Sequence, residues 1–156
     1  MQVHLIDRKP TLVAYLRNTG PYGEPIAWFW QERAYPWLAS NDLLGQARYG
    51  ISLDDPALIA PAQCRYDACA EISSGAKLPA SVLTQTIPGG RYANYQFRGT
   101  ASEVALAWDR MLRDWLPASG LQLDARPCFE HYPRDASYDP DSGVFGCEIC
   151  IPVAPL

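Results

Sequence analysis

The alternation of apolar and polar positions divides the chain into two similar halves. Each half begins with a strand-like run rich in aliphatic and aromatic residues, over 11–17 in the first half and over 90–98 in the second, and both runs end at glycine or threonine turn signals. A helical segment follows each run. Two further strand-like runs are predicted after each helix, over 46–53 and 63–72 and then over 127–133 and 144–153. Each half therefore has the order strand–helix–strand–strand.

The second helix, over 101–116, has the clearer pattern, because its apolar residues recur at the three- and four-residue spacing of an amphipathic helix. Thr100 and Glu103 have the spacing of a capping box, which marks the start of this helix. Pro117 and Gly120 predict its end. The first helix is predicted near 23–40, and Pro36 should kink or shorten its last turn.

Paired tryptophans fix the register of the repeat. Trp30 and Trp37 are seven residues apart, as are Trp108 and Trp115, and the offset between the pairs is 78. The sequence therefore predicts one α+β domain over 1–156, with repeat halves of 1–72 and 82–156 and a linker over 73–81. Side by side, the halves would form one antiparallel sheet with two main helices and a central cleft at a pseudo-twofold axis.

Composition and charge exclude several classes of protein. The 156 residues carry 13 Lys and Arg against 17 Asp and Glu, a net charge of −4, and no basic stripe that would predict nucleic-acid binding. No apolar run reaches the roughly 20 residues of a membrane span. Five cysteines, an odd number, fit reduced thiols in a cytoplasmic protein.

Glu130 is the most informative candidate for chemistry, because it lies in a strand-like run that places Tyr132 on the same face. One interpretation is an edge-strand glutamate that faces water. The other is a half-buried carboxylate among aromatic rings, which would attract cationic ligands or, with a raised pKa, accept protons. Trp30, Trp108 and Tyr95 are candidates for the walls of such a pocket, and ordinary core packing is the competing interpretation.

No metal and no cofactor is expected. His4 and His131 are the only histidines, too few for a zinc site at sensible spacing. Cys147 and Cys150 have the C-x-x-C spacing, but on a strand they point to opposite faces and cannot chelate one metal without distortion. Phosphate-binding glycine loops and nucleophile elbows are absent from the sequence.

Five short motifs, in order, carry a resemblance that spans nearly the whole chain. They are Asn18-Thr-Gly-Pro-Tyr22, Cys64-Arg-Tyr-Asp-Ala-Cys69, Pro88-Gly-Gly-Arg-Tyr-Ala93, Trp115-Leu-Pro-Ala-Ser-Gly120 and Arg126-Pro-Cys-Phe-Glu-His-Tyr132. With them the chain resembles the GyrI-like family, the small-molecule-binding domain also found as the effector-binding half of AraC-type and MerR-type regulators. The resemblance implies a tandem strand–helix–strand–strand fold.

The resemblance also implies a role for Glu130, which matches the family's functional glutamate in the cleft that meets cationic, aromatic ligands. Some stand-alone members use that glutamate to hydrolyse cyclopropane-containing toxins, and others inhibit DNA gyrase. The chain departs from the family pattern at His131, where an aliphatic residue is usual. Gly50 and Ser52 occupy the positions that the repeat relates to Glu130 and Tyr132, which predicts a pocket with charge on one side only.

We therefore expect a stand-alone, cytoplasmic bacterial domain that senses or sequesters lipophilic cationic small molecules. Its cleft would have Glu130 at the base and Tyr132, Trp30, Trp108 and Tyr95 as ligand contacts. Two alternatives stay open: a hydrolase of cyclopropane-containing toxins that uses Glu130 and Tyr132, and a protein that interacts with DNA gyrase. Because the chain starts at its first strand, any DNA binding in transcription regulation would have to come from a partner regulator.

Overall fold

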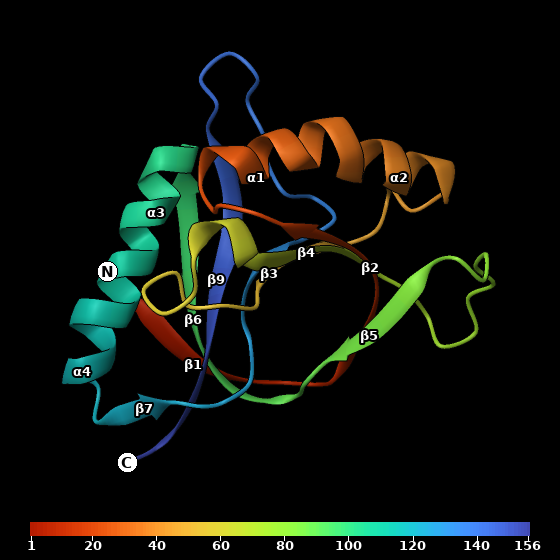
Figure 1. Cartoon of the computed structure of the whole chain (residues 1–156). Helices are drawn as coiled ribbons and strands as arrows, with labels where there is room; N and C mark the ends of the chain where they lie inside the picture. The colour runs from red at the N-terminus through yellow and green to blue at the C-terminus, as the bar shows by residue number, and fades with distance from the viewer.

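One curled antiparallel sheet of nine strands runs through the computed structural model, which describes residues 1–156 (Figure 1). The strand order is β1-β6-β9-β8-β3-β4-β2-β5, with β7 paired to β9 beside this path. The strands are β1 (Val3–Arg8), β2 (Thr11–Thr19), β3 (Arg48–Ser52), β4 (Arg65–Glu71), β5 (Leu83–Ile87), β6 (Gly90–Gly99), β7 (Leu121–Leu123), β8 (Cys128–Tyr132) and β9 (Phe145–Pro155).

The strand order is symmetric about the central β8–β3 pair, which confirms the predicted tandem repeat and its pseudo-twofold axis. On either side of that pair lie β9 and β4, then β6 and β2, and finally β1 and β5. The outermost strands are exchanged, because β1 pairs with β6 of the second half and β5 pairs with β2 of the first. Strands β1, β5 and β7 are not predicted by the sequence pattern.

Each helical segment contains a π-helical turn that ends two residues before a proline. The first consists of α1 (Glu24–Phe29), η1 (Trp30–Ala34) and α2 (Tyr35–Ser40), and the second of α3 (Ala101–Asp109), η3 (Arg110–Trp115) and α4 (Leu116–Ala118). The Tyr35 N–H reaches back to the Trp30 carbonyl, and the Leu116 N–H reaches back to that of Met111. Proline has no N–H for the ordinary ladder, so the wider turn accommodates it. The expected distortion at Pro36 takes this form, and the second helix continues through Pro117.

The predicted capping box is confirmed at the start of α3. The Glu103 carboxylate accepts a hydrogen bond from the Thr100 N–H at 2.9 Å, and the Thr100 side chain caps the third residue of the helix. These contacts satisfy backbone donors that have no partner within the helix. The helix therefore begins at a fixed residue, and Trp108 lies eight residues after Thr100, about two turns into the helix.

Both helical segments cover the same face of the sheet and leave its two central strands between them (Figure 1). The first segment packs on β2 and β4 through a cluster that includes Phe29, Leu38 and Ala68. The second packs on β6 and β9 through Met111 and Ile149. The opposite face curls into a half-barrel around a third cluster of nine buried residues that spans strands from both halves. None of the helices has the length and apolar character needed to cross a membrane.

Candidate functional site

The pairing of β3 with β8 forms the floor between the two helices. Along this pair, Gly50 lies opposite Glu130, and Arg48 lies opposite Tyr132. Because side chains alternate along a strand, Glu130 and Tyr132 share the face that the helices cover. Strand β8 is flanked by β3 on one side and β9 on the other, so the interpretation of Glu130 as an edge-strand residue is wrong.

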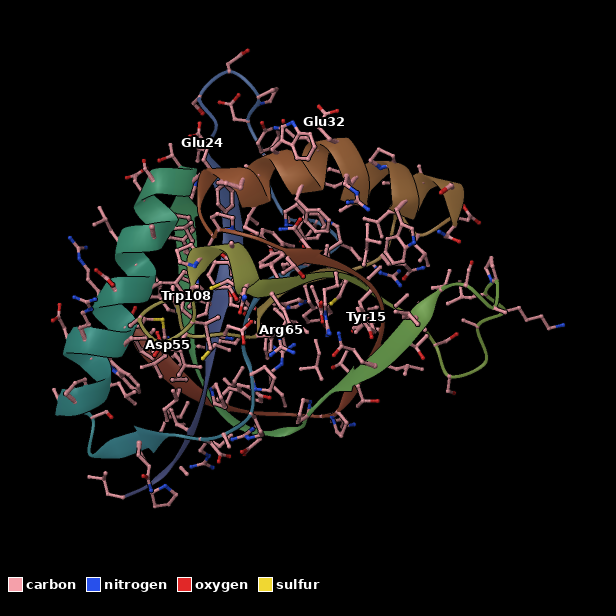
Figure 2. The ribbon with its side chains drawn as sticks, in the orientation of Figure 1. Tyr15, Glu24, Glu32, Asp55, Arg65 and Trp108 are labelled. Carbon is pink, nitrogen blue, oxygen red and sulfur yellow. The ribbon has the colours of Figure 1, made fainter.

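Glu130 is a half-buried carboxylate without a cationic partner. The Trp108 indole donates to Glu130 Oε2 at 3.4 Å, and no Lys, Arg or His nitrogen lies within salt-bridge distance. Burial raises the pKa of Glu130 to about 7, and the opposing effect of the Trp108 indole and the Tyr132 hydroxyl is smaller. Figure 2 shows Trp108 on the side of α3 that faces the sheet. The carboxyl group is therefore able to gain or lose its charge near neutral pH.

Tyr66 adds a second polar group to the floor between the two helices, from the first half of the chain. The Trp30 indole donates to the Tyr66 hydroxyl at 2.9 Å. A Cβ atom on Gly50 would lie 1.9 Å from that hydroxyl oxygen, so only glycine leaves room for the Tyr66 side chain over β3. Burial raises the pKa of Tyr66, and the nearby charge of Glu130 raises it further. The two equivalent tryptophans thus donate to two different acceptors on the same floor.

Aromatic rings extend from this centre to the surface. Trp30 meets Tyr132 edge-on at 6.2 Å between ring centroids, and Tyr132 lies 6.2 Å from Phe145. Burial also raises the pKa of the Tyr132 hydroxyl, with Glu130 as the next cause. The arrangement joins one carboxylate to a continuous aromatic wall, which favours an organic cation.

Arg48 lies among three aromatic rings, of which Trp30 and Tyr132 belong to this wall and Tyr35 lies beside it. Its guanidinium carbon is 5.2 Å from the Tyr132 ring centroid, 5.5 Å from that of Tyr35 and 6.0 Å from that of Trp30. Its Nη1 donates to the Tyr35 hydroxyl at 2.6 Å, and no carboxylate lies within salt-bridge distance. We call Trp30, Tyr35 and Tyr132 the aromatic cage.

Four of the five predicted site residues therefore come together: Glu130, Tyr132, Trp30 and Trp108. Tyr95 lies further away, on β6, with Ile149 of β9 between it and Glu130 in the same row of the sheet. It packs with the core under the second helix. Tyr66, Arg48 and Tyr35 were not among the residues that the sequence predicts for the site. The one available signal was Gly50, because a glycine within a strand suggests the close approach of another group.

The opposite face of the sheet holds a separate polar group around His131. Its Nδ1 contacts the Glu148 carboxylate, and its ring stacks on that of Tyr49 at 4.7 Å. The contact with His131 holds the pKa of Glu148 below its ordinary value. Tyr49 and His131 line a hollow of about 440 Å³ together with Arg8 and Glu71. His131 and Glu130 therefore serve different faces, as the strand period predicts.

The cysteines follow the same alternation. Cys147 packs under the second helix, and Cys150 packs in the cluster of the half-barrel, so the C-x-x-C pair is divided between the two faces. All five cysteines are free thiols. No group of three or more His, Cys, Asp or Glu side chains is arranged to hold a metal ion.

Two helices over a curled antiparallel sheet, with one carboxylate among aromatic rings between them, define a class of small-molecule-binding domains. The chain belongs to the GyrI-like small molecule binding domain family, whose model matches residues 1–154. A protein named DNA gyrase inhibitor from Serratia proteamaculans is 30% identical over 153 residues, and the alignment covers 96% of each chain. A second protein of that name, from Edwardsiella ictaluri, is also 30% identical, with 98% of each chain covered.

Solved structures share the fold at lower sequence identity. EcmrR, solved in a complex with DNA, matches with a TM-score of 0.76 at 15% identity, over 99% of this chain and 58% of the EcmrR chain. The present chain thus corresponds to little more than half of EcmrR, and it covers 98% of the separately solved EcmrR C-terminal domain. The protein SAV2435 bound to tetraphenylphosphonium matches with a TM-score of 0.71 at 18% identity, over 99% of this chain and 94% of SAV2435.

Proposed function

We propose that this protein binds lipophilic organic cations between its two helices, with Glu130 as the counter-charge. The observation that carries the proposal is a half-buried carboxylate with no cationic partner, contacted by the Trp108 indole at 3.4 Å. A charge in such surroundings is costly until an opposite charge accompanies it. A ligand cation would supply that opposite charge.

The aromatic residues around Glu130 set the chemical class of the ligand. Trp30, Trp108, Tyr66 and Tyr132 offer rings whose faces attract cations, and they offer little hydrogen-bonding capacity beyond the groups already paired. A delocalised or aryl-substituted cation would use both the charge and the rings. The solved neighbour bound to tetraphenylphosphonium supports this class of ligand.

We propose that ligand binding by this chain serves sensing or sequestration in the cytoplasm. Five free thiols fit a reducing compartment. The matched portion of EcmrR belongs to a regulator that was solved with DNA, so a sensing role here would pass through a partner that binds DNA.

Calorimetry with two ions of the same shape and opposite charge tests the proposal. Tetraphenylphosphonium should bind the wild-type protein, and tetraphenylborate should not. Glu130→Gln should weaken phosphonium binding by about ten- to a hundredfold, because a hydrogen bond or contact with a charged group is worth about 1.5–3 kcal/mol. Glu32→Gln, on the exposed outer side of the first helix (Figure 2), removes the same charge and should leave the affinity unchanged. Equal affinity for both ions would refute the proposal.

A second candidate function is hydrolysis of a strained ring. A pKa of about 7 suits Glu130 to accept a proton from water near neutral pH, with Tyr132 beside it to orient that water. Two solved neighbours are named hydrolases from Listeria innocua, with TM-scores of 0.61 and 0.59. Single-turnover assays with a cyclopropane-bearing substrate would test this function. Product from the wild type that is lost in Glu130→Gln would support it, and tight binding without product would exclude it.

A third candidate is an interaction with DNA gyrase, favoured by the names of the relatives that are 30% identical over nearly their whole length. A supercoiling assay with purified gyrase would test it. Inhibition that the wild type and Glu130→Gln share would indicate an interaction surface that is independent of the cleft. Unchanged supercoiling at a large excess of the protein would exclude this candidate.

A further inference from the structure

Arg48 already occupies the aromatic surface that a ligand cation would need. Its guanidinium lies 5.2–6.0 Å from the centroids of all three rings of the aromatic cage. Two of those rings, Trp30 and Tyr132, also wall the space beside Glu130. A cation within about 6 Å of a ring centroid gains the electrostatic attraction of that ring, so the cage holds a cation of its own.

The guanidinium is held in the cage without neutralising the carboxylate. The Arg48–Tyr132 and Gly50–Glu130 pairs are successive same-face positions along β3 and β8, a separation of roughly 7 Å along the strand. Despite this proximity, Arg48 and Glu130 form no salt bridge. The one hydrogen bond of the guanidinium goes outward, to the half-exposed Tyr35 hydroxyl at 2.6 Å. The floor between the helices therefore keeps an unpaired carboxylate, while the guanidinium of Arg48 covers the rings of the aromatic cage.

We infer that Arg48 is a tethered competitor, which fills the aromatic cage in the free protein and must leave before a ligand cation can use it. The inference rests on the proposed function, because it concerns the same cleft. A ligand that binds only the open cage has an apparent affinity reduced by the fraction of molecules in which the cage is open. The apparent affinity of every cation that contacts the cage should be reduced by the same factor, and the affinity of a ligand that does not contact it should be unchanged.

Removal of the guanidinium should therefore raise affinity. We expect Arg48→Met, which keeps an unbranched side chain and removes the charge, to bind tetraphenylphosphonium about tenfold more tightly than the wild type. Arg33→Met is the matched control, because Arg33 is exposed on the helical segment that carries Trp30 and Tyr35, and its side chain makes no hydrogen bond or ion pair within the protein. It removes the same charge from the surface and should leave the affinity nearly unchanged.

Tyr35→Phe separates occupation of the cage from simple charge repulsion. This variant keeps both the ring and the positive charge, and it removes only the hydroxyl that accepts from Arg48 Nη1. A looser guanidinium leaves the cage more often, so affinity should rise two- to fivefold, a smaller gain than in Arg48→Met. Charge repulsion alone would predict no change in Tyr35→Phe. Thermal unfolding of each variant identifies any that fails to fold. If Arg48→Met does not fold, the affinity of Tyr35→Phe tests the inference.

The outcomes separate this inference from the proposed function. One outcome refutes the tethered competitor and leaves the proposed function standing. In it, tetraphenylphosphonium binds the wild type and binds Glu130→Gln more weakly. At the same time, the affinity of Arg48→Met rises no more than that of Arg33→Met, and the affinity of Tyr35→Phe does not rise at all. If the phosphonium binds neither the wild type nor Arg48→Met, both fail. Binding that is weak in the wild type and strong in Arg48→Met supports both.

Discussion

Glutamine at position 130 should stabilise the ligand-free protein at alkaline pH and have little effect in acid. Burial raises the pKa of Glu130 from 4.5 to about 7, so the native state resists the ionisation that the unfolded chain undergoes freely. The stability that the neutral carboxyl provides is fully present below about pH 4.5 and is lost as the pH rises through about 7. Glutamine stays neutral throughout this window and avoids the loss.

The size of the effect follows from the separation of the two pKa values. A shift from 4.5 to about 7 corresponds to about 3 kcal/mol of unfolding free energy at pH values above 7. The shift is an order-of-magnitude quantity, so we expect Glu130→Gln to exceed the wild type by about 2–3 kcal/mol at about pH 8 and by less than about 0.5 kcal/mol at about pH 4.5.

Urea denaturation at the two pH values measures this difference directly. Glu32→Gln, an exposed carboxylate on the first helix, provides the control and should show no such pH dependence. An advantage of Glu130→Gln that is the same at both pH values would refute the reasoning, because glutamine would then be acting through packing and not through ionisation. A carboxylate that destabilises the ligand-free protein at alkaline pH is what the proposed cation site requires.

Three further outcomes are expected. Calorimetry should find the affinity for tetraphenylphosphonium rising about tenfold from about pH 6 to about pH 8, as the cleft carboxyl with a pKa of about 7 ionises, and an affinity that falls over this range would contradict the site. Gly50→Ala, whose Cβ would lie 1.9 Å from the Tyr66 hydroxyl, should lose about 1–3 kcal/mol in urea denaturation, whereas Gly45→Ala in open space should lose little. His131→Gln should destabilise the protein near neutral pH, and this deficit should vanish as acid protonates Glu148 below its ordinary pKa of 4.5; a deficit unchanged in acid would exclude the ionic contact as its cause.

The elements that the sequence could predict are those with strong internal patterns. The strand–helix–strand–strand order, the helix cap at Thr100 and the repeat of the tryptophans all depend on residues near one another in the chain. Strands β1 and β5 have no such pattern, because they lie at the two ends of the sheet and most of their side chains are exposed. Strand β7 is only three residues long. The assignment of β1 and β5 depends on pairing with strands about 70–90 residues away, and that of β7 on pairing with β9 about 30 residues away.

The residues of the candidate site also fall into those that the sequence could predict and those that it could not. The period of a strand places Glu130 with Tyr132, and the repeat selects Trp30 and Trp108 as equivalent positions. The other contributors depend on which strands are neighbours. Arg48 reaches the cage because β3 pairs with β8 in a register that sets it opposite Tyr132, and no spacing within either strand encodes that register.

The asymmetry at the pseudo-twofold axis follows from the electrostatics of a duplicated fold. Each half directs one indole N–H to the floor of the cleft, from Trp30 to the Tyr66 hydroxyl and from Trp108 to the Glu130 carboxylate. Gly50 and Glu130 are directly opposite each other across the axis, so a glutamate at both positions would place two carboxylates side by side. Like charges in such a pair cannot both ionise without a large cost. Glycine in one half removes that conflict and admits the Tyr66 ring, so the floor between the helices carries a single carboxylate at this level, as the proposed binding of one monovalent cation requires.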